Sequence, residues 1–166
     1  INIIPILLIL HFMCNFNINR DSLHTILREK YDIDATYDSC NYPGVKCKYY
    51  FYNEYGMDFE KQRGSVLEEH RSLTVEELAK TLKYTKVSFM IFRTGGCLIV
   101  GNCSEEVLRF VYVFVKNILV AEFQSIYIHR IDAIDAELNA KKNTKLRKRK
   151  ITVSTPYFSM LKSIDR

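Results

Sequence analysis

The chain has 166 residues, 48% of them hydrophobic and 13% aromatic, so its length suits one domain with an appendage and its composition allows a substantial core. Its net charge is +5, but residues 141–150 alone hold seven Lys or Arg and no acid. The rest holds 17 basic and 19 acidic residues, a net charge of −2. The overall charge therefore does not indicate a nucleic-acid partner.

The first predicted element is a buried strand over Ile6–Ile18. The apolar start of the chain is too short to span a bilayer, and it lacks the basic flank and the small-residue cleavage site of a signal peptide. We therefore expect neither a membrane span nor a leader here. A helix should follow, because apolar residues recur at helical spacing after a candidate N-cap at Asp21 or Ser22.

Two strand regions with turn signals occupy the middle of the chain. The first, Tyr37–Tyr52, breaks at Tyr42-Pro43-Gly44 and resumes as an alternating run, and the second, Ser88–Gly101, has two apolar arms around Thr94-Gly95-Gly96, which predicts a hairpin. Residues 53–86 between them form a charged insertion. Within it, Thr74 stands three residues before Glu77, the spacing of a capping box, so we expect a surface helix there.

A long helix should begin after Ser104 and lie across the sheet, since Ser104 suits an N-cap and two glutamates follow it. A short strand is expected within residues 123–131. The element order predicts an α+β fold with a curved antiparallel sheet and helices on its convex face, in a domain of residues 1–130 followed by a basic linker and tail of residues 131–166. The apolar face of the long helix comprises Val107, Leu108, Val111, Phe114, Val115, Ile118 and Leu119.

The alternation along the two strand regions divides their residues between two faces of the sheet. The inner face comprises Cys47, Tyr49, Ile91, Cys97 and Ile99. The outer face comprises Tyr42, Lys46, Lys48, Phe92, Thr94, Leu98 and Val100. An antiparallel sheet usually has one dry and one wet face, but this outer face is aromatic, aliphatic and basic, with no acid at these positions. We therefore expect it to contact a partner.

These motifs resemble one repeat of the TATA-box-binding protein family, particularly its divergent versions in large double-stranded DNA viruses. The family's first strand pattern is similar to Tyr37-Asp38 and Tyr42-Pro43-Gly44 with the apolar and basic run after them. Its second is similar to the run from Ile91 to Gly101, and "MCNFNINRDSL" resembles the segment entering the first helix. The resemblance covers about residues 5–123, interrupted by the insertion.

The resemblance implies a mechanism as well as a fold. Members of the family lay a concave sheet on the minor groove and drive apolar wedges between base steps, which bends the duplex. The two wedge phenylalanines of a repeat correspond to Tyr42 and Phe92. A phosphate-contacting arginine corresponds to Lys48, with Lys46 a second phosphate candidate. A backbone-contacting serine corresponds to Thr94, and an apolar groove contact to Leu98.

The departures from the family pattern concern base reading. The asparagine that reads the groove falls at Ile9, and a neighbouring valine at His11. The threonine before the last glycine becomes Val100, and the lysine after the turn becomes Gly96. The minor groove offers mainly acceptors at A·T pairs, so losing donors weakens sequence reading more than bending. We expect relaxed sequence specificity.

The resemblance also implies partners. Double-stranded DNA would bind the outer face, and initiation factors or RNA polymerase subunits would dock on the exposed side of the long helix, at Glu105, Arg109 and Lys116. The family carries two repeats, so either a second repeat is missing from this sequence or two chains pair edge to edge. The expected location is intracellular, in a viral replication compartment of the host cytoplasm or in the host nucleus.

A binding module without DNA reading is the alternative to a DNA-binding factor, and an enzyme is not expected. The histidines, His11, His24, His70 and His129, have no partner at a diagnostic catalytic spacing, and no phosphate-binding glycine loop is present. The cysteines, Cys14, Cys40, Cys47, Cys97 and Cys103, are odd in number and form no C-x-x-C pair. We therefore expect free buried thiols in a reducing compartment, with no metal site and no cofactor.

Overall fold

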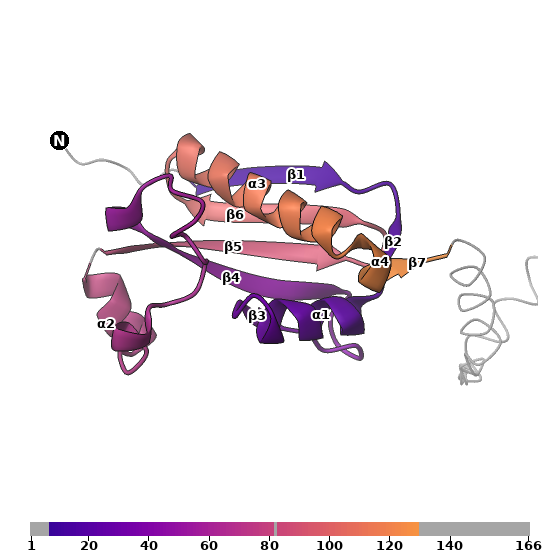
Figure 1. Cartoon of the computed structure of the whole chain (residues 1–166), viewed down its shortest axis with the longest axis horizontal. Coiled ribbons are helices and arrows are strands. Elements are labelled where there is room, and N and C mark those ends of the chain that lie inside the picture. Colours follow the sequence, from indigo (N-terminus) through magenta and orange to yellow (C-terminus); the bar gives the residue numbers. More distant parts are fainter. Residues whose placement is uncertain (1–6, 82, 130–166) are drawn as a thin grey trace, which may run out of the picture. The chain divides into compact units, whose positions relative to one another are not determined.

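The structure is a computed structural model that describes residues 7–81 and 83–129 (Figure 1). The basic run at 141–150 and the tail after it lie outside the described residues. The helices are α1 (Arg20–Glu29), α2 (Val75–Lys80), α3 (Glu105–Ala121) and α4 (Phe123–Ile126), with single 3-10 turns at Asn53–Tyr55 and Glu68–His70. The strands are β1 (Leu7–Met13), β2 (Asn17–Ile18), β3 (Asp34–Thr36), β4 (Gly44–Tyr52), β5 (Tyr84–Phe92), β6 (Gly96–Asn102) and β7 (Tyr127–Ile128).

Five strands form one antiparallel sheet in the order β1-β6-β5-β4-β3, and β2 pairs with β7 in a second, two-stranded sheet. The helices α1 and α3 pack on the same side of the large sheet, with α3 running across it (Figure 1). The predicted α+β fold, an antiparallel sheet with α1 and the long helix α3 on one face, is confirmed. The likeness to a particular family stays a prediction.

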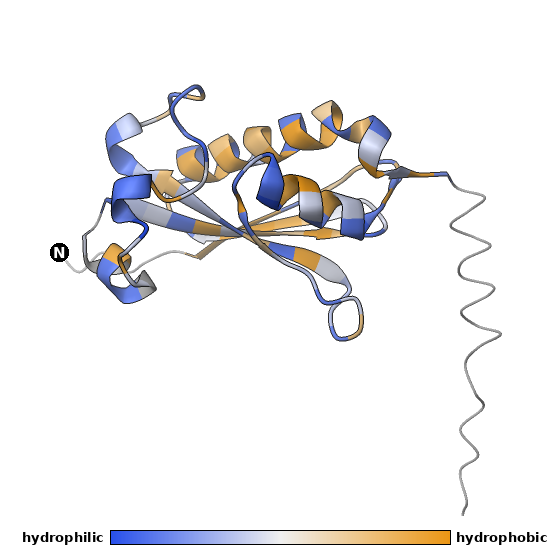
Figure 2. Ribbon diagram, turned by 60° about the horizontal axis from the view of Figure 1, so that its bottom comes forward, coloured by the Kyte–Doolittle hydropathy of each residue, from blue (hydrophilic) through white to orange (hydrophobic). Residues whose placement is uncertain are grey.

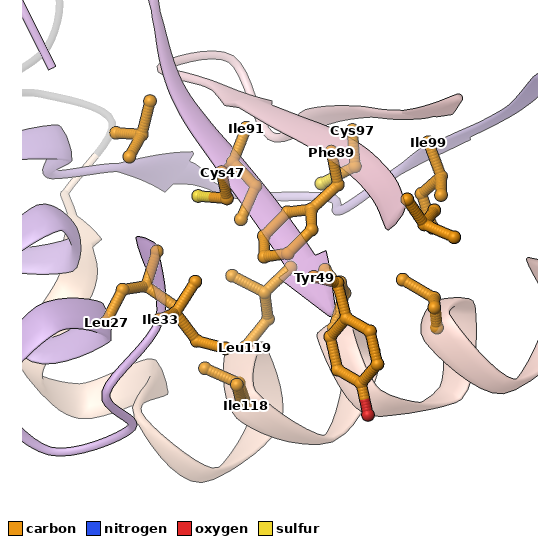
Figure 3. Close-up of a cluster of buried hydrophobic side chains, with 14 of the residues drawn as sticks. Leu27, Ile33, Cys47, Tyr49, Phe89, Ile91, Cys97, Ile99, Ile118 and Leu119 are labelled. Carbon is orange, nitrogen blue, oxygen red and sulfur yellow. The ribbon is translucent and has the colours of Figure 1, made fainter. Parts of the chain in front are cut away.

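The core lies between the inner face and these two helices. All five predicted inner-face residues are buried, with Tyr49 and Ile99 fully so. Phe89, also on this face, is 2% exposed and points toward the helices (Figure 3). Of the predicted apolar residues of α3, six are buried and Phe114 is half-buried against Tyr49, whose ring lies 4.8 Å away. Each such side chain contributes about 1.5–3 kcal/mol on burial, so this layer pair holds the fold.

The N-caps of α2 and α3 are the ones predicted from the sequence, whereas the N-cap of α1 is not. Ser104 accepts the N–H of Val107 at 3.3 Å, and Thr74 and Glu77 form the predicted capping box of α2. The N-cap of α1 is Asn19, whose Oδ1 accepts the N–H of Ser22 at 3.2 Å, so the predicted cap at Asp21 or Ser22 is wrong. Asn caps a helix as well as Asp or Ser does.

The carboxylate of Glu122, just after α3, ties that helix to the end of α1. Lys30 Nζ donates to Glu122 Oε1 at 2.6 Å and Tyr31 Oη donates to the same oxygen at 2.7 Å. The bond from Lys30, followed by that from Tyr31, holds the pKa of Glu122 below its usual range. Burial, assisted by Glu122, raises the pKa of Tyr31 to about 12. The buried charge is therefore satisfied by two donors from the neighbouring helix end.

The first strand differs from its prediction. A single buried strand over Ile6–Ile18 is wrong, because β1 ends at Met13 and the chain then turns away to form β2. Alternate residues of β1 face away from the core, and because β1 is an edge strand the outward-facing Leu7, Ile9 and Met13 remain 61%, 64% and 55% exposed. Apolar composition alone did not reveal this one-sided exposure.

The predicted hairpin is confirmed as β5 and β6, and its turn depends on Gly95. This residue has φ +83°, a conformation that L side chains rarely adopt. A Cβ added there would lie 2.4 Å from the carbonyl oxygen of Cys14, whose N–H donates to Gly95 O at 2.7 Å. The glycine thus allows the end of β1 to bond to the turn.

The insertion covers one end of the outer face, where the sequence predicted an open surface. Tyr84 Oη accepts the N–H of Leu67 at 3.3 Å and hydrogen-bonds His70 Nδ1 at 2.7 Å, and the His70 ring packs beside that of Tyr52. The helix α2 lies on the opposite side of the sheet from α1 and α3 (Figure 2). The open part of the outer face is therefore limited to the half nearer the β5–β6 turn and the β1 edge.

Candidate nucleic-acid interface

The strand register brings the predicted outer-face residues together in two rows across the sheet. In one row Lys46, Met90, Leu98 and His11 lie opposite one another on β4, β5, β6 and β1. In the next row the corresponding residues are Lys48, Ser88, Val100 and Ile9. Six of the nine predicted site residues thus lie in these rows, and Phe92 follows on the same face of β5 opposite Gly44. Tyr42 precedes β4, and Thr94 lies exposed in the β5–β6 turn.

Tyr42 lies over the outer face beside the first row. Its hydroxyl donates to Met90 Sδ at 3.1 Å, and Lys46 Nζ lies 3.6 Å from the centroid of its ring, a cation–π contact. The ring is half-buried in this position. The aromatic side chain and the ammonium group therefore form one unit on the surface.

The loop that carries Tyr42 is ordered by its own hydrogen bonds. The Asp38 carboxylate accepts the side-chain amide of Asn41 at 2.6 Å and the backbone N–H groups of Cys40 and Asn41 at 2.9 and 3.2 Å. These bonds, the Asn41 side chain first, lower the pKa of Asp38. Arg20 of α1 donates to Pro43 O at 2.7 Å. The Tyr42 ring is therefore carried by a turn that these hydrogen bonds hold in place.

Phe92 occupies a trough made by two glycines. A Cβ added at Gly44, its register partner on β4, would meet the Phe92 ring at 3.1 Å, and one added at Gly96 would lie 3.7 Å from the same ring. The Cβ added at Gly96 would also lie 3.4 Å from Met13 Sδ and 3.8 Å from Thr94 Oγ1, which are ordinary van der Waals distances. Phe92, Met13 and Thr94 therefore surround Gly96 at this end of the outer face, and only Gly44 is in tight contact with the Phe92 ring.

The two lysines differ in a way that the sequence did not show. Lys48 Nζ donates to Asp34 Oδ2 at 2.8 Å, and this bond raises the pKa of Lys48. Asp34 sits opposite Lys48 on β3, so the outer face also holds an acid, at a position outside the two strand regions from which the sequence described this face. Among the described residues, Lys46 makes no ion pair and has its cation over Tyr42 instead. Lys46 is the more available phosphate ligand of the two.

The apolar side chains of the outer face become more exposed toward the β1 edge. Leu98 and Val100 are half-buried between neighbouring strands, whereas Ile9 is 64% exposed and His11 is also exposed. The sequence reasoning missed Met90, Ser88 and Met13, which strand parity alone places on this face. It also missed Asp34, which only the β3–β4 pairing brings there. The site is a broad apolar surface across β5, β6 and β1, with Lys46 beside it on β4.

Other kinds of site have little support within residues 7–81 and 83–129. No group of three or more His, Cys, Asp or Glu side chains among them is arranged to hold a metal ion. None of the helices in the same ranges has both the length and the hydropathy needed to cross a membrane. Burial raises the pKa of the Cys47 and Cys97 thiols, so these described cysteines are poor nucleophiles.

Comparison with protein families, with curated proteins and with solved structures gave no match. The resemblance to the TATA-box-binding protein family is therefore one of sequence motifs alone.

Proposed function

We propose that the chain is a DNA-binding transcription initiation factor that lies in the minor groove through its outer face and bends the duplex with relaxed sequence specificity. The observation that carries the proposal is the placement of Tyr42 and Phe92 on one open sheet face, beside Lys46. Aromatic and apolar side chains on such a face can enter between base steps, while a cation contacts the flanking phosphates.

The chemistry of the face accounts for the relaxed specificity. The central rows offer Leu98, Val100 and Ile9 to the groove, which make apolar contacts but donate no hydrogen bonds to base edges. Ser88 is the one hydroxyl within these rows. With few donors besides Ser88 and His11 to reach the acceptors of A·T pairs, discrimination depends on how easily a sequence deforms.

The exposed side of α3 is the surface we assign to other initiation factors or polymerase subunits. Its two exposed valines, Val113 and Val120, are 36% and 69% exposed and are one heptad apart. Arg109 and Glu105 nearby pair with each other at 2.7 Å. An apolar stripe beside charged residues suits a protein partner rather than DNA.

A bending assay on a short duplex tests the proposal, with fluorescence energy transfer between the duplex ends at low salt and anisotropy to measure binding separately. The wild type should bring the ends closer, and Tyr42→Ala/Phe92→Ala should bind without bending. Phe59→Ala is the matched control, since Phe59 is 50% exposed but stacks on Phe110 of α3, away from the outer face. A wild type that bends no duplex at low salt would refute the proposal.

The second candidate is a protein-interaction module of a viral transcription apparatus that retains the fold without reading DNA. The pairing of Lys48 with Asp34 favours it, because the pair removes a free cation from the face. Salt-dependent duplex binding that falls when Lys46 is replaced would decide against this candidate, since a protein-only surface has no phosphate contacts to lose.

A further inference from the structure

A cavity of about 710 Å³ lies between the insertion, the chain after α1 and helix α3, and the proposed DNA contacts do not use it. Its volume falls within the range of roughly 300–1,000 Å³ that is usual for ligand sites. The aromatic rings that line it are those of Tyr31, Tyr52, Tyr55, Phe59 and Phe114. Phe114 is only half-buried although it belongs to the apolar face of α3, because it borders this space. The cavity therefore offers aromatic surface to an apolar group.

An ion pair between Asp32 and Arg71 borders both this cavity and a second one of about 520 Å³. Arg71 Nη2 donates to Asp32 Oδ2, which links the insertion to the chain after α1. Among the described residues, neither side chain makes a further hydrogen bond. A guanidinium group has several N–H donors and a carboxylate has a second acceptor oxygen, so both partners keep hydrogen-bonding capacity for a ligand.

The backbone at Asp32 indicates that its side chain has a role. Asp32 has φ +53°, and no other non-glycine residue in the described ranges has a positive φ. The next residue, Ile33, donates its N–H to Leu27 O at 2.9 Å, so the chain turns back onto α1 at this point. Glycine adopts such a conformation without strain, whereas an aspartate is only tolerated there. The carboxylate, rather than the turn, therefore explains an aspartate at this position.

Charges of both signs line the larger cavity in nearly equal number. The basic residues are Lys30, Lys61, Arg63 and Arg71, and the acidic residues are Asp32, Glu60 and Glu68. Lys30 and Lys61 also have acidic partners outside the lining, Glu122 and Asp58. A ligand with a large charge of one sign would therefore meet like charges here, whereas a ligand with one charge of each sign can pair both.

We propose that this cavity binds a free aromatic α-amino acid as its zwitterion, with the ring among the aromatic side chains and the two charged groups beside the Asp32–Arg71 pair. The carboxylate of the ligand faces the open donors of Arg71, whose planar fork suits a carboxylate. Its ammonium group faces Asp32 Oδ1. The ligand thus lies antiparallel to the ion pair, and the bond between Arg71 and Asp32 need not break. This site is separate from the DNA-binding proposal and does not depend on it.

L-tryptophan is a direct probe, because the chain itself contains no tryptophan and the fluorescence of the ligand can be excited alone. The anisotropy of L-tryptophan should rise on titration with the full chain, with a Kd of about 1 mM or below. N-acetyl-L-tryptophan lacks the ammonium group and L-tryptophanamide lacks the carboxylate. Each should bind about tenfold more weakly, since each loses one charge-assisted contact.

Two variants test the roles of the ion pair separately. Asp32→Gly suits the backbone at this position and removes the carboxylate, so it should abolish the preference for L-tryptophan over its N-acetyl analogue. Arg71→Met should abolish the preference over the amide. A merely structural effect would weaken all three ligands equally. Arg109→Met is the matched control, since Arg109 is also exposed and paired with one acid, Glu105, but lies outside the cavity lining.

Several outcomes would overturn the proposal, with circular dichroism showing that each variant is folded. One is no binding of L-tryptophan at up to about 10 mM. Another is equal binding of the three ligands, which would mean a nonspecific apolar cavity. Tighter binding of the dipeptide glycyl-L-tryptophan would show that the site recognises a peptide instead. Unchanged ligand preferences in both Asp32→Gly and Arg71→Met would show that the ion pair does not contact the ligand.

Discussion

The structure, unlike the sequence, shows that among the described residues Lys48 is in an ion pair and Lys46 is not, and this difference predicts different contributions of the two lysines to DNA binding. Each phosphate contact lowers the slope of log affinity against log salt by about 0.9, which is about 3.5-fold in affinity between about 50 and 200 mM salt. Lys46→Met should remove about one such contact. Lys48→Met should remove much less, because Lys48 must leave Asp34 before it reaches a phosphate.

The magnitude of the difference follows from the exposure of the pair. The side chains of Lys48 and Asp34 are 45% and 40% exposed, so solvent screens their attraction and the pair contributes about 0.2–1 kcal/mol. Asp34→Asn releases Lys48 from this competition. It should therefore tighten duplex binding by up to about fivefold and steepen the salt dependence by up to one phosphate contact.

Fluorescence anisotropy with a labelled duplex over a salt series measures all three variants. Lys86→Met is a suitable control, because Lys86 is an exposed lysine on β5 that lies opposite Tyr50, beyond the open half of the face. Equal losses of slope for the Lys46 and Lys48 variants, or no effect of Asp34→Asn, would show that the ion pair does not restrain Lys48 and would refute this reasoning.

Three further predictions concern stability. Gly95→Ala should lower the free energy of unfolding in urea by about 2 kcal/mol or more, since Gly95 has φ +83° and a backbone oxygen 2.4 Å from the added carbon. Gly56→Ala, with φ +53° and nothing within 4 Å, should cost less. The pKa of Glu122 is lower in the folded than in the unfolded state, so its carboxylate stabilises the fold above the unfolded pKa of about 4.3. This stabilisation is lost as the pH falls through the folded pKa. Glu122→Gln should therefore make the melting temperature fall less steeply with decreasing pH. Phe89→Ala should cost about 3–5 kcal/mol in the same urea titration.

Each of these has an outcome that contradicts it. Equal losses for the Gly56 and Gly95 variants would mean that backbone strain alone, rather than the close oxygen, sets the cost. An acid limb unchanged in the Gln variant would show that Glu122 does not govern acid unfolding. A Phe89 variant within about 1 kcal/mol of the wild type would mean that the inner face is not closely packed.

The sequence predicted most elements of the fold because their signals are local. Ser104 and the pair Thr74 and Glu77 mark helix starts because their side chains bind backbone N–H groups only a few residues away. The turn at Gly95 likewise joins the two apolar strands directly on either side of it. The cap at Asn19 was missed although it belongs to the same chemistry, because Asp21 and Ser22 close behind it are equally good capping residues. Helix ends and tight turns depend on a few neighbouring residues, so they can be read locally.

Features that depend on strand pairing could not be predicted. Asp34 reaches Lys48 only because β3 pairs with β4, fourteen residues along the chain. The exposure of Ile9 follows from the position of β1 at the edge of the sheet, and composition favoured a buried strand there. The covering of the far outer face by residues 67–70 likewise results from an insertion folding back across β4 and β5.

By itself, the sequence determined which residues alternate to the two faces of the sheet, since the two-residue period of a strand is a property of the backbone. That was enough to place Lys46 and Phe92 on one side, whereas Tyr42 reaches the same side from the turn before β4. Only the tertiary structure decided which of the lysines pairs with an acid and which strands lie at the edges of the sheet. Those properties depend on distant segments brought together by the burial of the inner face, and no local pattern encodes them.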